Sequence, residues 1–509
     1  MMRGFSKKTA RFLGLAAMVL FACLLMLCVI SSLGWTATSI VEENRMNQKV
    51  LVRSDSLPVN LLLTALAAAV LALVHALLEK HADRKFCIAA ATVFVLLSLC
   101  FVLAVGLLPR ADSYLALEAA KRFAAGDYGL MKSVYFSRVS YQLGLVLPME
   151  MITRLLPGLD LNMTMQALNC VMTVLAAWAL CLLAGEVTGD TRTKKGSMLL
   201  YGAYASMLLF NMFVYGALPM ILLCALAMLC FARYVRTGRK GYGVGYALLI
   251  GAAAVVKPNA MIMMLALAIC AVLYALEKKD AFLPACALVS AVLCVLLPKA
   301  VVALYELRSG VTLGADTGML LRLAMGLQDS VIAAGWYNGM IEEYWDLAVT
   351  AQTEKAAAMQ MLSERLSEFS ADPAMAWDFF SEKYLTQWAE PAYDILWYGG
   401  VCEESGRFNG LANMLFRDNA PARVALEGYM NLFQQAVYAL ALFGTVDLIR
   451  EKKIGAAQLM LPVVIIGGFL YHMLFEAKSQ YIYPYMMLMI PLAARGLSLL
   501  SARFKRRKT

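Results

Sequence analysis

The sequence carries little charge for its length. Of its 509 residues only 16% are Asp, Glu, Lys or Arg, and 61% are apolar, whereas about a quarter of the residues in a soluble domain are charged. The charges fall in short islands between apolar runs, and each run is long enough to cross a hydrocarbon core of about 30 Å as a helix rising about 1.5 Å per residue. The composition therefore argues against a soluble domain and predicts an all-α polytopic membrane protein.

Residues that bind metals are also scarce. The chain has three histidines, and its 12 cysteines mostly stand singly inside apolar runs, as small buried apolar residues do. The sequence contains no disulfide framework, no zinc-ligand spacing and no Asp-x-Asp motif. We therefore expect neither a bound metal nor a cofactor.

Two targeting and binding signals are missing as well. The first apolar run, 12–33, is too long for a signal peptide and does not end at an Ala-x-Ala site. The net charge of +10 arises from 45 basic and 35 acidic residues, but the basic runs lie at helix ends, where they act as cytoplasmic anchors. We therefore expect no nucleic-acid partner.

The apolar runs predict thirteen candidate helices. They cover 12–33, 59–78, 88–108, 141–157, 163–185, 197–213, 216–233, 244–256, 259–277, 281–303, 427–449, 455–474 and 481–500. Lys and Arg in short loops indicate the cytoplasmic side, and such residues occur at both termini. With both termini in the cytoplasm the number of crossings is even, so we expect about 12 membrane helices (11 to 13) in the plasma membrane.

One of the thirteen candidates must then fail to cross. The weakest is 141–157, which is short and is interrupted by a proline and two charged residues. We expect it to be embedded near the outer face. The alternative is that the loop holding Arg192 lies outside, and parity alone does not separate the two.

The chain divides into three regions. Residues 1–303 form an N-terminal membrane module with an outer loop at 109–140. Residues 304–426 form an extracytoplasmic segment, in which helical spacing of Ala, Met and Leu predicts amphipathic helices. Residues 427–509 form the last membrane helices and a basic cytoplasmic tail.

An acidic residue stands at the outer mouth of the third apolar run. Asp112 follows Pro109 and precedes Tyr114. A carboxylate there, with its basicity raised by apolar walls, can accept a proton from a hydroxyl group. Alternatively Asp112 caps a helix that starts at Ser113, because Asp is a favoured N-cap. The sequence leaves both roles open.

Polar residues also mark the start of the ambiguous segment and a break between two later helices. Arg138, Tyr141 and Gln142 can hold a phosphate or a hydroxyl-rich group, or they are residues of the membrane interface. Lys257, followed by Pro258 and Asn259, interrupts apolar sequence on both sides, and a charge in that setting is costly unless it is paired. Its partner is either a substrate phosphate or a neighbouring acid.

A last polar run separates two strongly apolar helices at the outer face. It extends from Glu476 to Tyr481 and includes Lys478 and Gln480. Both charges can reach one cavity. The alternative is a solvated turn, although such turns more often use Gly, Asn and Asp than this helix-forming run.

Taken in order, these residues resemble the motifs of the GT-C membrane glycosyltransferases, especially the bacterial branch related to glycosyltransferase family 39 and the protein mannosyltransferases. The likeness covers most of the chain. The motifs that carry it are Arg110-Ala111-Asp112-Ser113-Tyr114, Gly126-Asp127-Tyr128, Tyr141-Gln142-Leu143-Gly144, Val214-Tyr215-Gly216, Val256-Lys257-Pro258-Asn259, Met325-Gly326-Leu327, Gly335-Trp336-Tyr337, Lys383, Gln387-Trp388-Ala389-Glu390-Pro391 and Glu476-Ala477-Lys478-Ser479-Gln480-Tyr481.

The resemblance implies an enzyme that takes a sugar from a polyprenyl-phosphate carrier on the outer face and gives it to a glycan, glycolipid or protein. It implies that Asp112 is the general base. The sequence departs from the family pattern at Gln480, where an arginine is expected, and at Ser140-Tyr141, where Pro-His is commoner. These departures put donor-phosphate contacts by those positions in question. Two extra helices also precede the outer loop.

The expected chemistry needs one base. A polyprenyl phosphate leaves as an anion, so the cations Arg138, Lys257 and Lys478 can stabilise it by neutralising its charge. A double displacement would require a second, nucleophilic carboxylate beside the anomeric carbon, so we expect inversion with Asp112 as base. The predicted substrate-binding residues are Tyr114, Arg138, Tyr141, Gln142, Lys257, Asn259, Glu476, Lys478, Gln480 and Tyr481.

Charges at membrane depth, such as Lys257, also mark transport paths. A lipid-linked oligosaccharide flippase or another secondary transporter is therefore the alternative function. A transporter should show paired halves and charges near the middle of the membrane, whereas this sequence gathers its polar residues on one face. A non-catalytic scaffold of the cell envelope is the third possibility.

Overall fold

The structure, a computed structural model, describes residues 2–41, 48–81, 84–346, 349–400 and 409–506. Within these residues ten helices are long and apolar enough to cross a membrane. They are α1 (Met2–Gly34), α2 (Leu57–His81), α3 (Arg84–Val105), α7 (Leu161–Thr188), α10 (Ala217–Thr237), α12 (Ala260–Lys278), α13 (Phe282–Ser309), α19 (Pro421–Arg450), α20 (Ala456–Leu474) and α21 (Tyr483–Arg506). A shorter apolar helix, α11 (Lys240–Val256), packs among them. The chain is a nearly all-α polytopic membrane protein, as its composition predicts.

Two candidate crossings are not long helices. The segment 141–157 forms α6 (Leu143–Leu155), with only 13 residues, in line with the expectation that it falls short of a full crossing. The candidate 197–213 is wrong as a single helix, because it breaks into α8 (Thr191–Ala203) and α9 (Ala205–Phe210).

The break between α8 and α9 lies at Tyr204, which has extended backbone geometry. Its buried ring stacks on Phe433 at 5.2 Å and on Tyr483 at 5.9 Å between ring centroids. This packing against α19 and α21 compensates for the interrupted helix. It has no counterpart in local apolar periodicity, so the sequence pattern does not reveal it.

Basic residues from several loops meet at one end of the bundle. Arg192 forms an ion pair of 2.7 Å with Glu79, and Arg236 forms one of 2.6 Å with Glu186 near the end of α7. The loop holding Arg192 therefore lies at the same end as the loop after α10. This placement contradicts the alternative that the Arg192 loop lies on the opposite side. We call this end the basic end.

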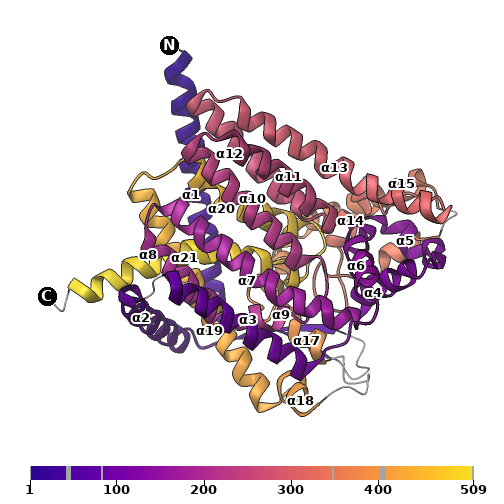
Figure 1. The fold of residues 1–509 in the computed structure, drawn as a ribbon, viewed down its shortest axis with the longest axis horizontal. Helices are drawn as coiled ribbons and strands as arrows, with labels where there is room; N and C mark the ends of the chain where they lie inside the picture. Colours follow the sequence, from indigo (N-terminus) through magenta and orange to yellow (C-terminus); the bar gives the residue numbers. More distant parts are fainter. Residues whose placement is uncertain (1, 42–47, 82–83, 347–348, 401–408, 507–509) are drawn as a thin grey trace.

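The opposite end is covered by short helices. Figure 1 shows α4, α5, α6, α14 and α15 gathered at the right of the bundle, while both chain termini lie toward the left. The short helices at this end are α4 (Ala111–Ala124), α5 (Val134–Arg138), α14 (Met319–Gly326), α15 (Ala351–Ala371), α16 (Pro373–Trp388), α17 (Ile395–Gly400) and α18 (Gly410–Phe416). Short 3-10 turns at Gly129–Lys132, Ser140–Gln142 and Met340–Tyr344 lie between these helices, and another at Ser479–Tyr481 lies between α20 and α21.

An antiparallel hairpin between α1 and α2 belongs to the same end and is absent from the sequence-based prediction. Strand β1 (Trp35–Val41) pairs with β2 (Gln48–Ser54) in the register Trp35 to Ser54 and Val41 to Gln48. Strand β1 contains two Thr, one Ile and one Val, and β2 contains two Val; such β-branched residues favour extended backbone. The hairpin also donates backbone hydrogen bonds to the outer segment, from Ala37 N to Ala389 O and from Val50 N to Ile332 O.

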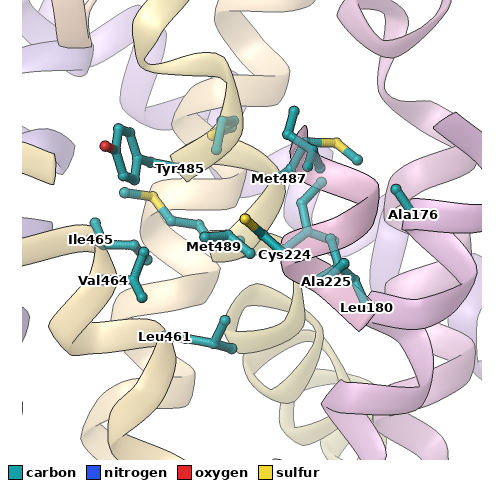
Figure 2. Packing of buried hydrophobic residues seen from close by; sticks show 14 of the residues in the cluster. Ala176, Leu180, Cys224, Ala225, Leu461, Val464, Ile465, Tyr485, Met487 and Met489 are labelled. Carbon is teal, nitrogen blue, oxygen red and sulfur yellow. The ribbon is translucent and has the colours of Figure 1, made fainter. Parts of the chain in front are cut away.

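The core lies where four membrane helices meet. Figure 2 shows Leu180 of α7, Cys224 of α10, Leu461 of α20 and Met489 of α21 converging. Helix α21 also lies directly on α19. A Cβ at Gly444 would lie 2.2 Å from the carbonyl oxygen of Leu492, so only glycine permits this approach. Such small-residue contacts are typical of membrane helices, which associate mainly through van der Waals packing.

Candidate functional site

Two adjoining cavities open between the helices opposite the basic end. The small cavity has a volume of about 260 Å³ and the large cavity one of about 1260 Å³. Five side chains line both cavities and so form their boundary: Tyr141, Tyr215, Arg322, Glu476 and Tyr481. The small cavity also contacts Gln142, Lys257 and Asn259, and the large cavity contacts Asp112, Lys478 and Gln480. Nine of the eleven predicted site residues therefore line one or both cavities.

Asp112 lies in the first turn of α4. Ala111 before it has a left-handed backbone with φ 46°, which is uncommon for a residue with a Cβ and is often found at functional sites. Ser113 after it donates a hydrogen bond of 2.6 Å to the carbonyl oxygen of Val214. These constraints bring Asp112 to Tyr215, whose hydroxyl donates a 3.1 Å hydrogen bond to Asp112 Oδ2.

The structure corrects two expectations about Asp112. The N-cap of α4 is Arg110, and no side chain caps this helix, so the capping role proposed for Asp112 is wrong. The carboxylate is also exposed to the large cavity rather than enclosed by apolar walls, because the loop turns it away from the packed faces of α4. Asp112 is therefore accessible to a molecule in the large cavity.

Lys257 lies at the turn between α11 and α12. It is 8% exposed, and its Nζ lies 4.1 Å from the ring centroid of Tyr215 and 5.6 Å from that of Tyr481. Within the part of the chain that the structure describes, no carboxylate lies at ion-pair distance from Lys257, but Asp112 and Glu476 act on its charge electrostatically, so the alternative of an acidic partner is reduced to these longer-range interactions. Its charge faces the small cavity between two aromatic rings.

Two glycines fix the position of Lys257. A Cβ at Gly144 would lie 1.9 Å from the carbonyl oxygen of Val255, and one at Gly216 would lie 2.6 Å from that of Val256. The starts of α6 and α10 therefore press directly on the end of α11. This close approach explains why both glycines stand beside site residues in the sequence.

The loop that carries Glu476 is held by the outer segment. Lys383, which is fully buried in α16, donates hydrogen bonds to the carbonyl oxygens of Gly326 and Phe475. Ala477 N donates to Gly335 O at 2.7 Å. The motifs around Gly326, Gly335 and Lys383 thus meet at one place and support the cavity wall from behind.

Glu476 faces both cavities. Tyr481 OH donates a 3.3 Å hydrogen bond to its Oε1. Burial raises the pKa of Glu476, while the cations Lys478 and Arg322 counteract part of this effect. The carboxyl group is therefore a second acid at the boundary of the cavities, besides Asp112.

Two residues that line both cavities, Tyr215 and Arg322, are absent from the predicted site residues, and the motifs that carry the resemblance include Tyr215 but not Arg322. Arg322 projects from α14, lines both cavities, and lies 5.6 Å from the ring centroid of Tyr141. The available signal was a single cation in the apolar run Met-Leu-Leu-Arg-Leu from Met319 to Leu323. On an amphipathic helix of the outer segment such a cation normally faces solvent, so the pattern alone does not single it out.

Two predicted residues are not brought to the cavities. Tyr114 is 52% exposed on α4 and belongs to the lining of neither cavity. Arg138 is 4% exposed and donates hydrogen bonds to the carbonyl oxygens of Asp346 at 2.7 Å and Val349 at 3.3 Å. It also lies 3.9 Å from Glu354. These contacts occupy Arg138 in fastening α5 to the outer segment, so it does not contact either cavity.

Comparisons with known proteins give only a distant structural likeness. No protein-family model matches the sequence, and no curated protein matches it. The structure is similar to the archaeal oligosaccharyltransferase AglB from Archaeoglobus fulgidus, solved in complex with an inhibitory peptide and a dolichol-phosphate, with 13% identity and a TM-score of 0.44. The match covers 85% of this chain and 52% of that chain, so this chain spans about half the length of its neighbour. A likeness of this degree identifies neither a family nor an activity.

Proposed function

We propose that the protein is a GT-C-type membrane glycosyltransferase that moves a sugar from a polyprenyl-phosphate donor to an acceptor hydroxyl. One observation carries this proposal. The hydroxyl of Tyr215 binds the Asp112 carboxylate, while the ring of the same tyrosine contacts the Lys257 ammonium. A base and a cation that forms no close ion pair within the described residues thus lie on either side of one side chain, where two cavities meet.

This arrangement suits transfer from a phosphate leaving group. Asp112 accepts the proton of the acceptor hydroxyl while the oxygen of that hydroxyl attacks the anomeric carbon of the sugar. The bond between that carbon and the phosphate oxygen breaks, and the polyprenyl phosphate leaves as an anion. Lys257, Arg322 and Lys478 offset its negative charge. Attack from the side opposite the phosphate inverts the anomeric configuration. Arg322 takes the role that the sequence suggested for Arg138.

We also propose that the cavities open on the non-cytoplasmic face of the plasma membrane, with both termini in the cytoplasm. The basic runs lie at the opposite end of the bundle, as expected for cytoplasmic loops. Membrane-impermeant thiol labelling of intact cells should therefore reach a cysteine at position 480 and should not reach one at position 452. Labelling at position 452 and not at 480 would reverse the orientation.

The alternative of a transporter is less well supported. The charged residues of the two cavities gather at one end, and below them the four helices of Figure 2 are packed through apolar side chains. A transport path needs polar groups or water through the middle of the membrane. The asymmetry therefore favours chemistry on one face.

Mass spectrometry of envelope glycans from cells with and without the gene tests the proposed function. We expect one glycan, glycolipid or glycoprotein to lose a sugar when the gene is deleted. Purified protein in liposomes should then release polyprenyl phosphate from the donor of that sugar. Unchanged glycans, together with no consumption of any polyprenyl-phosphate sugar, would contradict the proposal.

A further inference from the structure

The hairpin β1–β2 contacts the loop that carries Lys478. Ala37 and Val50 of the hairpin belong to one small apolar cluster with Trp336 and Ala477. Ala477 stands directly between Glu476 and Lys478 in the chain. The extra pair of N-terminal helices therefore places its connecting hairpin against the wall of the large cavity.

A second, polar connection runs from the hairpin to Lys478 itself. Gln48, at the start of β2, is 6% exposed and also lines the large cavity. Its amide donates hydrogen bonds to Asp394 Oδ1 and to Ser39 Oγ. The other oxygen of Asp394, Oδ2, lies 3.4 Å from Lys478 Nζ. The carboxylate thus bridges the hairpin and the cation.

Asp394 is itself held in place. It is 3% exposed, its backbone N donates a 2.8 Å hydrogen bond to Glu390 Oε2, and its backbone is left-handed with φ 66°. A buried carboxylate is costly unless it is paired and hydrogen-bonded. Ser39, Gln48 and Lys478 meet this requirement, so the positions of Gln48 and Lys478 depend on Asp394.

Other neighbours also act on the charge of Lys478: Trp397 and Glu476 attract it, and Lys257 repels it. Its ammonium lies 5.6 Å from the ring centroid of Trp397, and it interacts electrostatically with Glu476 and Lys257. A lysine side chain has four rotatable bonds, so without Asp394 the ammonium would turn toward Glu476. The carboxylate of Asp394 keeps it at the other side of the large cavity.

We propose that Asp394, held by Gln48 of the hairpin, is a positioning residue that fixes Lys478 at the wall of the large cavity, and that the hairpin is therefore part of the substrate site. The group that Lys478 would receive there is the donor phosphate, and this last step rests on the proposed function. The positioning itself does not depend on it.

The positioning is tested by the chemical reactivity of Lys478 in the full-length protein. Acetylation of lysines with an N-hydroxysuccinimide ester, followed by peptide mass spectrometry, measures how fast Lys478 reacts. Asp394→Asn keeps the side-chain shape and tolerates the left-handed backbone, and Gln48→Ala removes the amide donor. Both should raise the rate of Lys478 acetylation several-fold, because the ammonium loses the carboxylate or its fixed position.

Thr36→Val is the matched control. Thr36 lies in β1 and donates a hydrogen bond to Asp55 at the other end of the hairpin, so its replacement perturbs the hairpin without touching Asp394. Its Lys478 should react like that of the unmodified protein. Equal Lys478 rates in the unmodified protein, Asp394→Asn and Gln48→Ala would overturn the positioning role. A rate raised equally by all three variants would also overturn it, because the effect would then reflect general loosening.

Polyprenyl phosphate binding tests the link to the site. We expect Lys478→Ala and Asp394→Asn each to weaken binding by about 2- to 150-fold, the range that coupling energies of about 0.5–3 kcal/mol span, and the double variant to be no weaker than Lys478→Ala alone. If the double variant instead weakened binding by the product of the two single-variant factors, Asp394 would act independently of Lys478, and the proposed positioning would be contradicted. If the unmodified protein does not bind polyprenyl phosphate, the proposed function fails, and the acetylation rates still decide whether Asp394 positions Lys478.

Discussion

The ammonium group of Lys257 lies 4.1 Å from the ring centroid of Tyr215. A cation–π contact of this kind stabilises by about 0.5–2 kcal/mol, whereas removing an ammonium group from water costs several kcal/mol. The contact with Tyr215 alone therefore does not offset the burial of Lys257. Asp112 and Glu476 supply part of the remaining stabilisation electrostatically, and an anionic group bound in the small cavity would add to it.

Replacing Lys257 with methionine should separate function from stability. Loss of the cation should weaken donor binding by about 10- to 100-fold, because interactions with a charged partner are worth about 1.5–3 kcal/mol. The melting temperature should stay the same or rise, because a costly buried charge is removed. Lys257→Arg, which keeps the charge, should retain more binding. Donor binding unchanged by Lys257→Met would remove Lys257 from the phosphate site.

Gly144→Ala should destabilise the protein. The new methyl group would lie 1.9 Å from the carbonyl oxygen of Val255, so the backbones of α6 and α11 must move apart. Overpacking of this kind costs about 1–3 kcal/mol. Gly158→Ala is the matched control, because its Cβ would meet no atom within 4 Å. Thermal unfolding in detergent should show a lower melting temperature for Gly144→Ala alone. Equal melting temperatures would contradict the packing of α6 on α11.

Stability should depend on pH through Glu390. Burial raises the pKa of this carboxyl from an ordinary value of 4.5 to about 8, and the charge of Asp394 adds to the effect. Between these two pH values the folded protein binds more protons than the unfolded chain, so the free energy of unfolding falls as pH rises and levels off above about pH 8. The side chain of Glu390→Gln is neutral at every pH, so this variant does not show that decrease in the free energy of unfolding.

The melting temperature of Glu390→Gln relative to the unmodified protein should therefore increase from pH 5 to pH 8.5. Burial lowers the pKa of Lys383 to about 7, which acts in the opposite direction at higher pH. Lys383 is present in both proteins, so the difference between them isolates Glu390. Parallel melting curves over this pH range would contradict a raised pKa of Glu390.

The long helices could be predicted from sequence because each is an apolar run bounded by charges, and the lipid bilayer leaves little choice of backbone structure for such a run. The strands Trp35–Val41 and Gln48–Ser54 and the break at Tyr204 could not be predicted in this way. The strand pair and the break are both stabilised by contacts with residues far along the chain, such as Ala389 and Phe433. Local sequence patterns do not show which distant residues a segment will contact.

The candidate site was predictable where a charge interrupts apolar sequence, as at Lys257 and Glu476. It was not predictable in the outer loop and the outer segment, where a charge normally faces solvent. Arg138 stands beside Ser137, and Arg322 interrupts a short apolar run of an amphipathic helix, yet only Arg322 lines the cavities. The path of the outer segment decides their roles. Its backbone carbonyl groups bind Arg138, and its helix α14 places Arg322 at the cavities.

The most direct test of the account is sugar transfer by Asp112→Asn compared with Asp127→Asn. Asp127 lies on the same outer loop, accepts a 2.8 Å hydrogen bond from Gly129 N, and lines neither cavity. Release of polyprenyl phosphate from the sugar donor by purified protein in liposomes measures turnover. We expect Asp112→Asn to lower turnover by at least ~100-fold, as loss of a general base does, and Asp127→Asn to retain turnover near that of the unmodified protein. Normal turnover by Asp112→Asn would contradict the account.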